Sequence, residues 1–265
     1  MDKLAGLVLP EMHLPLRKLA PAAGLLAGLA AALCAPTARA NPHARAAIGY
    51  APAAWRVIAQ ARAASGGNGW NLLRGWCESG HEGSLPYEAW LDPLRYGLRI
   101  ELREPAGRSV HGFNGQGEWR IEPSGAVSGG GEAAAVARAR TEAFFAIDGY
   151  FFPSRFEARG TSLGVRRSGG RVYDVVQVEP WGGTPRELWF DRASHLLARM
   201  VDRAGPQAQT AELSDYRKVG PVKIAFRTML KGPDGAVRVR QLDAVSFAPP
   251  DRALFSLPRT APATP

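Results

Sequence analysis

The residues whose types and spacing could support catalysis are few. Residues 160–164 match the G-x-S-x-G pattern around a serine nucleophile, and Asp174 or Asp191 followed by His195 come later, in the order of a catalytic triad. However, the residues after Ser162 have the pattern of a strand, whereas a nucleophile of this type sits on a sharp turn that leads into a helix. We therefore predict that the chain is not an enzyme, and keep a serine hydrolase that uses Ser162 only as an alternative.

Metal and cofactor chemistry has no better support. Four histidines lie beyond residue 40, and they are His43, His81, His111 and His195. None of them has the H-x-H, H-x-x-x-H or H-E-x-x-H spacing of metal ligands. The three glycines at 129–131 precede neither a Lys-Ser/Thr pair nor a G-x-G-x-x-G pattern after a strand. We therefore predict no catalytic residues, no metal site and no cofactor.

The densest group of aromatic residues is the feature that could hold a ligand. Residues 144–156 contain six aromatic side chains. They could line a hydrophobic cavity against the neighbouring strands or fill the core, and the two interpretations differ in void volume, because a filled core leaves little space for a ligand. The candidates for cavity lining are Trp90, Leu98, Ile100, Leu102, Phe144, Ile147 and Phe151.

These residues must be positioned by strands and by two helices. Helical spacing of apolar residues predicts helices over 53–65 and 132–147. Residues 95–103 alternate between apolar and charged side chains, which is typical of a strand with one buried face. Similar patterns predict strands around Trp76 and over 87–91, 108–113, 118–121, 161–167, 171–179, 186–191, 196–202, 210–216, 222–230 and 237–247.

The order of these elements predicts an α+β, mostly antiparallel fold. Each strand has one apolar face to cover, so the simplest arrangement is a curled sheet of about 10–12 strands with helices on its concave face. Residues 41–258 would form this one domain, since β-rich domains commonly reach 200–250 residues. Residues 259–265 are rich in Pro, Thr and Ala and are predicted to be a disordered tail.

The first forty residues have the pattern of a signal peptide. An apolar stretch over 19–33 follows Arg17 and Lys18, and Ala38-Arg39-Ala40 is an A-x-A cleavage signal. The stretch is shorter than the roughly 20 residues of a membrane span. We predict export to the periplasm with cleavage after Ala40; whether translation starts at Met1 or Met12 stays open.

Charge and cysteine content limit the classes of partner and the kinds of stabilising bond that the chain can have. The formal net charge is +9, but the positive residues are spread along the strands and no aromatic stacking motif accompanies them, which argues against nucleic acid. Attraction to anionic membranes would be at most peripheral. Cys77 is the one cysteine after the predicted cleavage site, so the domain cannot form an internal disulfide and must depend on a hydrophobic core.

Three segments of the second half carry a family resemblance. They are residues 187–200 (ELWF-D through LLARM), 214–227 (SDYRKVGPVKIAFR) and 249–258 (PPDRALFSLP). Together they resemble the LolA-like superfamily of periplasmic, outer-membrane lipoprotein-sorting carriers, including the RseB-like envelope sensors. They are also similar to the non-catalytic N-terminal domain of some retroviral-type aspartyl proteases, although this chain has no Asp-Thr-Gly or Asp-Ser-Gly triplet.

The resemblance implies a half-open β-barrel, or half-barrel, whose helices plug the concave face. The space between sheet and helices would take acyl chains or other hydrophobic ligands, and the function would be that of a periplasmic carrier of an acyl-chain or lipoprotein-type ligand. The alternative in the same fold is an envelope protein–protein interaction or stress-sensor module with a protein partner. Fold alone does not decide between them.

Overall fold

The computed structural model describes residues 49–257, so the predictions for residues 1–40 and 259–265 lie outside this part of the chain. Within it, fourteen strands form one sheet. The strands are β1 (Gly49–Tyr50), β2 (Trp76–Glu82), β3 (Leu85–Asp92), β4 (Gly97–Glu104), β5 (Gly107–Asn114), β6 (Glu118–Ile121), β7 (Val127–Gly129), β8 (Ala158–Ser168), β9 (Arg171–Pro180), β10 (Arg186–Asp191), β11 (Leu197–Asp202), β12 (Gln209–Val219), β13 (Val222–Lys231) and β14 (Val237–Ser246).

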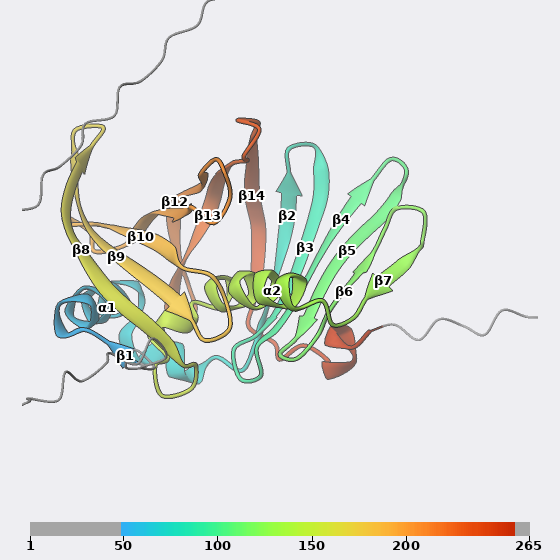
Figure 1. The fold of residues 1–265 in the computed structure, drawn as a ribbon, viewed down its shortest axis with the longest axis horizontal. Helices are drawn as coiled ribbons and strands as arrows, with labels where there is room; N and C mark the ends of the chain where they lie inside the picture. Colours follow the sequence, from blue (N-terminus) through green and yellow to red (C-terminus); the bar gives the residue numbers. More distant parts are fainter. Residues whose placement is uncertain (1–48, 258–265) are drawn as a thin grey trace, which may run out of the picture. The chain divides into compact units, whose positions relative to one another are not determined.

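The sheet is antiparallel except at one edge. Its order is β1-β8-β9-β10-β11-β12-β13-β14-β2-β3-β4-β5-β6-β7, and only β1 pairs in parallel, with β8. Two hairpin-connected runs, β2–β7 and β8–β14, are thus joined by the pairing of β14 with β2. The sheet curls but does not close, because β1 and β7 lie at opposite ends of the order (Figure 1).

The predicted fold class is confirmed. The long strands of the second half fall within a few residues of their predicted ranges, and 186–191 coincides with β10. The sheet has more strands than expected partly because β1 and β7 contain only two and three residues. Strands this short show no alternation that a sequence could reveal.

Two helices and two short 3-10 turns cover the concave face (Figure 1). They are α1 (Pro52–Ser65), η1 (Gly67–Leu72), α2 (Ala133–Ala146) and η2 (Gly149–Phe151). Proline at the start of α1 fits the first helical turn. Gly66 caps the helix after Ser65 with a φ of 141°, which glycine adopts easily and other residues adopt only with strain. Both helices agree with the predicted ranges to within one residue at each end.

Strand alternation gives the sheet two different faces. The registers of β3 and β4 put Leu91 opposite Leu98 on the concave side and Trp90 opposite Arg99 on the convex side. On the concave side, α2 packs against β4, β5, β6 and β9. The apolar residues of both elements thereby enter one core.

The convex side is covered locally by the end of the domain. The turn η3 (Arg252–Phe255) lies over β4 and β5, where the Trp119 indole N–H donates to the Phe255 carbonyl at 3.0 Å. Arg99 donates to the Leu254 carbonyl and pairs with the buried Glu101 at 3.0 Å. Residues 252–255 thus cover this part of the convex side of the sheet.

Candidate functional site

A cavity of about 400 Å³ lies between the concave face and the elements that cover it. Its wall includes residues from α1, α2, η2 and seven strands that range from β2 to β14, so it spans the junction of the two strand runs. The lining residues are Ala61, Ser65, Trp70, Trp76, Glu78, Leu98, Ile100, Glu142, Phe145, Ala146, Asp148, Tyr150, Phe151, Arg186, Leu196, Leu197, Met200, Ala211, Leu213, Tyr216, Lys223, Ile224, Ala225, Thr228, Leu230, Arg240 and Leu242.

The cavity stays open where the sheet carries small or medium-sized side chains. On β12 and β13, Ala211 pairs with Leu230 and Leu213 pairs with Thr228, and all four line the space. Above them α2 contributes Phe145, which is almost fully buried. An apolar wall of this kind can contact methylene groups, and the few polar groups can orient a ligand.

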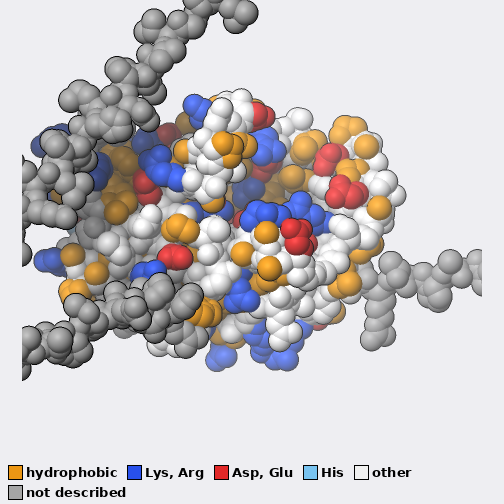
Figure 2. Space-filling model, in the orientation of Figure 1, with side chains coloured by type: hydrophobic (Ala, Val, Ile, Leu, Met, Phe, Trp, Pro, Cys, Tyr) orange, Lys and Arg blue, Asp and Glu red, His pale blue; other side chains and the backbone are white. Residues whose placement is uncertain are grey.

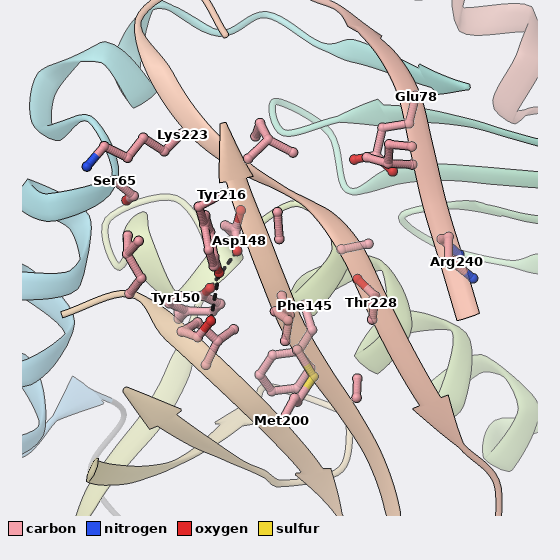
Figure 3. A pocket seen from close by; sticks show the side chains of 18 of the residues that line it. Ser65, Glu78, Phe145, Asp148, Tyr150, Met200, Tyr216, Lys223, Thr228 and Arg240 are labelled. Atoms are coloured by element: carbon pink, nitrogen blue, oxygen red, sulfur yellow. Dashed lines mark hydrogen bonds between the residues drawn. The ribbon is translucent and has the colours of Figure 1, made fainter. Parts of the chain in front are cut away.

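An acid and two tyrosines form a polar group within the cavity. Asp148 precedes η2 in the left-handed conformation (φ 51°), and the Tyr150 hydroxyl donates to its carboxylate at 2.5 Å. The Tyr216 hydroxyl donates to the Leu197 carbonyl at 2.7 Å. Figure 3 shows Asp148, Tyr150 and Tyr216 close together, with Phe145 and Met200 nearby.

Burial changes the protonation of this group. Loss of water around Asp148 raises the pKa of its carboxyl to about 7; the Tyr150 hydrogen bond opposes this rise and the charge of Glu78 adds to it. Burial likewise raises the pKa of the Tyr150 hydroxyl well above its ordinary value, so this side chain stays a hydrogen-bond donor. Near neutral pH the cavity therefore carries an acid that exists in both the neutral and the charged form.

A second polar group stands at the β14–β2 junction. The Glu78 carboxylate accepts from the Trp76 indole at 3.0 Å and from the Tyr87 hydroxyl at 3.3 Å. Burial raises the Glu78 pKa, although those bonds and the charge of Arg240 act against it. Arg240 itself donates to buried Glu82 at 2.7 Å and lies over the Tyr87 ring at 4.2 Å.

A histidine–carboxylate contact links α2 to the sheet beside the cavity. His111 on β5 lies 3.0 Å from Glu142 on α2. Burial raises the Glu142 pKa, but the bond and charge of His111, with the charges of Arg186 and Arg120, lower it further, so that the carboxyl ends below its ordinary range. Arg186 pairs with Asp202 at 3.1 Å and lies over the Phe145 ring. These contacts hold α2 over the cavity.

The predicted site residues fall into three groups. Leu98, Ile100 and Phe151 line the cavity. Phe144 and Ile147 are fully buried in the packed core and are not among the lining residues.

The other two predicted residues lie on opposite faces of the sheet. Leu102 is on the concave face and packs against the core, without lining the cavity. Trp90 is on the convex face, where the Arg99 guanidinium lies 5.5 Å from its ring. The structure thus brings together the β4 residues and Phe151, but not Trp90.

Sequence reasoning missed the polar lining. Glu78, Asp148, Tyr216 and Arg240 come from elements that are far apart in the chain, and no short motif contains two of them. Asp148 is followed by Gly149, a dipeptide that is typical of turns and does not by itself indicate a ligand site. Glu82 shares the strand face of Glu78 and Arg238 shares that of Arg240, so no single charge in an apolar pattern marks either residue.

The G-x-S-x-G motif does not form a nucleophile elbow. Ser162 lies inside the eleven-residue strand β8, which leads into a turn and β9 rather than into a helix. Its hydroxyl accepts from the Gly164 amide at 3.3 Å, next to a register shift in the β8–β9 ladder. The strand–turn–helix context that the serine chemistry requires is therefore missing at this position.

Two other kinds of feature are missing from the described part of the chain. Among residues 49–257, no three His, Cys, Asp or Glu side chains gather as a metal-binding group. No helix in this range is long and apolar enough to span a membrane.

Comparisons with known proteins identify the fold. The sequence matches no family model and no curated protein. Among solved structures, it is similar to the LolA superfamily protein NE2245 from Nitrosomonas europaea, with a TM-score of 0.52 and 12% identity over 77% of this chain and 97% of that one.

Two other solved structures overlap less well. A putative outer membrane lipoprotein-sorting protein domain from Vibrio parahaemolyticus has a TM-score of 0.45 and 10% identity over 72% of this chain and 90% of that one. MucB has a TM-score of 0.24 and 17% identity over 80% of this chain and 65% of that one. The likeness to retroviral-type proteases is not shown by these comparisons. The likeness to NE2245 alone shows that this chain has a fold similar to that of a LolA superfamily protein.

Proposed function

We propose that this chain is a periplasmic binding or carrier protein for a hydrophobic ligand of the acyl-chain or lipoprotein type. The observation that carries the proposal is the cavity of about 400 Å³ between the curled sheet and the helices. Ligand sites in proteins commonly have volumes of roughly 300–1,000 Å³ and mostly apolar walls with a few polar groups. The likeness of the fold to a LolA superfamily protein supports the same interpretation.

The driving force would be removal of apolar surface from water. Each methylene group that moves from water to the wall formed by Leu98, Leu213 and Ile224 would gain about 0.8 kcal/mol. The polar head of the ligand would meet Asp148 and Tyr216, which can exchange hydrogen bonds with it. Binding would then be an equilibrium between the membrane or a donor and the cavity.

Release requires a way out, and α2 is the element that covers the cavity. It is tied to the sheet by the Glu142–His111 pair and by Arg140, which donates to the Gly115 carbonyl at 3.3 Å. The buried Thr141 hydroxyl of α2 also accepts from the Thr184 amide at 2.8 Å. These polar contacts must break for α2 to shift. We propose that a partner protein or the membrane surface displaces this helix, so that the ligand leaves.

A cavity-filling substitution tests the proposal. Ala211→Phe adds a ring to the half-buried wall, whereas Ala244→Phe adds the same ring at an exposed position of β14. Titration with an environment-sensitive fluorescent fatty acid should show binding by the wild type and by Ala244→Phe, and binding about tenfold or more weaker for Ala211→Phe. Equal binding by both folded variants would place the probe elsewhere and remove the cavity from the proposal.

Exposed apolar side chains favour a second candidate, an envelope interaction or stress-sensor module. Trp55 on α1 and Leu72 at the end of the adjoining η1 are 37% and 71% exposed. A contiguous apolar patch on a surface can mark a protein contact, whereas single exposed apolar side chains are common. Capture of one stoichiometric partner that is lost in Trp55→Ser/Leu72→Ser, with no lipid bound to the wild type, would favour this candidate over a carrier.

A further inference from the structure

A second hollow, of about 350 Å³, lies outside the main cavity. It forms where the β3–β4 and β5–β6 turns meet α2, the segment after η2 and the residue that follows β9. None of its lining residues belongs to the wall of the main cavity. They are Leu94, Arg95, Tyr96, Gly115, Arg140, Arg155, Phe156, Glu157 and Trp181.

Three arginines from separate segments converge on this hollow, and Glu157 is the one acid in its wall. Arg95 pairs with the buried Asp92 at 3.1 Å. Arg140 donates to the Gly115 carbonyl at 3.3 Å, and Arg155 donates to the Pro93 carbonyl at 2.9 Å. Among the described residues, the guanidiniums of Arg140 and Arg155 are thus held by carbonyl oxygens and not by carboxylates. Figure 2 shows several groups of Lys and Arg side chains on the molecular face that carries α2.

Most arginines on the sheet have a different environment. Arg186 pairs with Asp202, Arg199 with Glu212 and Arg240 with Glu82, each at 3.1 Å or less. Most arginines on the strands thus have a carboxylate partner on the same or the next strand. Arg140 and Arg155 depart from that pattern while they line the same hollow, which leaves their positive charge for a ligand.

Both guanidiniums are fixed in place without using most of their donors. The Arg140 guanidinium lies 5.7 Å from the Tyr96 ring, and that of Arg155 lies 4.8 Å from the Phe152 ring. A guanidinium has five N–H donors, and each of these two gives one to a carbonyl. Ring contacts orient the planar groups in advance, so that binding an anion would cost little side-chain entropy.

We propose that Arg140, Arg155 and Arg95 bind a phosphate group. A phosphate has several oxygens that can accept from more than one guanidinium at once, and arginine forks match them in pairs. The hollow is larger than one phosphate, and its wall also contains the rings of Tyr96, Phe156 and Trp181. These rings would contact the organic part of the ligand. The site is separate from the main cavity, so this inference does not depend on the proposed carrier function.

Two probes distinguish a soluble phosphate from a lipid headgroup. Calorimetric titration with glycerol 3-phosphate tests the soluble source, and flotation with phosphatidylglycerol–phosphatidylcholine vesicles, compared with phosphatidylcholine alone, tests the lipid source. The test variant is Arg140→Gln/Arg155→Gln. The control is Arg166→Gln/Arg167→Gln, which removes the same charge from exposed positions of β8.

The proposal expects at least one probe to bind the wild type and the control alike, and to bind the test variant about tenfold or more weakly. Loss in the calorimetric arm assigns a soluble phosphate, and loss in the flotation arm alone assigns a headgroup. If the glutamine variant does not fold, Arg140→Lys/Arg155→Lys keeps the charge and removes the forks, and the same loss is expected. Binding of neither probe, or equal loss in test and control variants, would overturn the proposal.

Discussion

The concave face has two regions that are built from neighbouring residues but differ in packing. Over β4 and β5, the ring of Phe144 is fully buried and contacts Phe156 and Tyr96, whose own centroids lie 4.7 Å apart. Over β11–β13, the next residue along α2, Phe145, faces a cavity. One aromatic segment therefore supplies both a filled core and a cavity wall, and the side chains of the opposing strands decide which.

The physical difference is side-chain size on the sheet. Opposite the filled region, β5 carries Phe113, whose ring lies 6.1 Å from that of Tyr96. Opposite the open region, β12 and β13 carry Ala211 and Thr228. A gap left by small residues across from a rigid helix persists, because the backbone relaxes only partly to fill it. Substitutions in the two regions should consequently differ in their effects on stability.

Truncation in the filled region should have the largest effect. Phe144→Ala removes a fully buried ring from a packed cluster and should lower the free energy of unfolding by about 3–5 kcal/mol. Leu213→Ala, at the half-buried cavity wall, should cost about 2 kcal/mol or less because open space already adjoins it. Denaturant unfolding measures both values. Equal costs would mean that the two regions are packed alike.

A buried charge at the cavity should matter more than an exposed one near it. Arg240→Ala leaves Glu82 buried without its 2.7 Å partner and should cost about 3 kcal/mol at neutral pH. Arg238→Ala removes a 65% exposed side chain at 3.5 Å from the same carboxylate and should cost less than about 1 kcal/mol. Unfolding of the two variants side by side checks this ratio, and a larger cost for Arg238→Ala would contradict it.

The pH dependence of stability should report on Asp148. Its pKa in the folded protein, about 7, exceeds the roughly 3.9 of an unfolded aspartate, so the native state holds this proton more tightly. By linkage, its contribution to stability falls as the pH rises from about 4 to about 7 and is constant above that range. Asp148→Asn keeps a residue that tolerates the left-handed conformation and should flatten this part of the profile.

The matched control for that profile is Asp215→Asn. Asp215 also has a positive φ, of 52°, but it is exposed, and its hydrogen bond from Arg217 lowers the pKa of its carboxyl. Its contribution has the opposite sign, because it is present above the unfolded pKa and is lost as the pH falls. Thermal melts between pH 4 and 8 separate the two cases. A profile for Asp148→Asn that matches the wild type would show that Asp148 does not titrate as described.

The smallest effect should come from the His111–Glu142 contact that holds α2. Glu142→Gln should cost about 1 kcal/mol or less at neutral pH, because the Glu142 side chain is 42% exposed and water screens the pair. The pKa of this carboxyl is lowered in the folded protein. The difference in free energy of unfolding between wild type and variant should therefore disappear as the pH falls below the ordinary pKa of glutamate. Urea unfolding at several pH values measures it; a difference that persists in acid would assign the effect to packing.

The fold was predictable because the strands are long and alternate. Residues 95–103 alternate between apolar and charged side chains, and in β4 this alternation places Leu98 and Ile100 on the concave face. Pro52 and Gly66 mark the ends of α1 in the same direct way. These signals are local, and local signals can be recovered from a single sequence.

The cavity was predictable only in part, since it depends on which strands meet. Trp90 seemed equivalent to Leu98 as an apolar strand residue, but the β3–β4 register puts it on the convex face beside Arg99. A shift of one residue in register reverses the face of every side chain, and the sequence of one strand does not fix its register. The pairing of β14 with β2, which brings Arg240 to Glu82, is likewise a long-range event.

The central claim, that the cavity holds a hydrophobic ligand, is tested most directly by lipid mass spectrometry on the protein purified gently from a native-like periplasm. The account predicts a near-stoichiometric acyl lipid or lipopeptide with the wild type and with Ala244→Phe, and its loss with Ala211→Phe. Wild-type protein that is folded and free of lipid after such purification would contradict the claim and shift support to the interaction module.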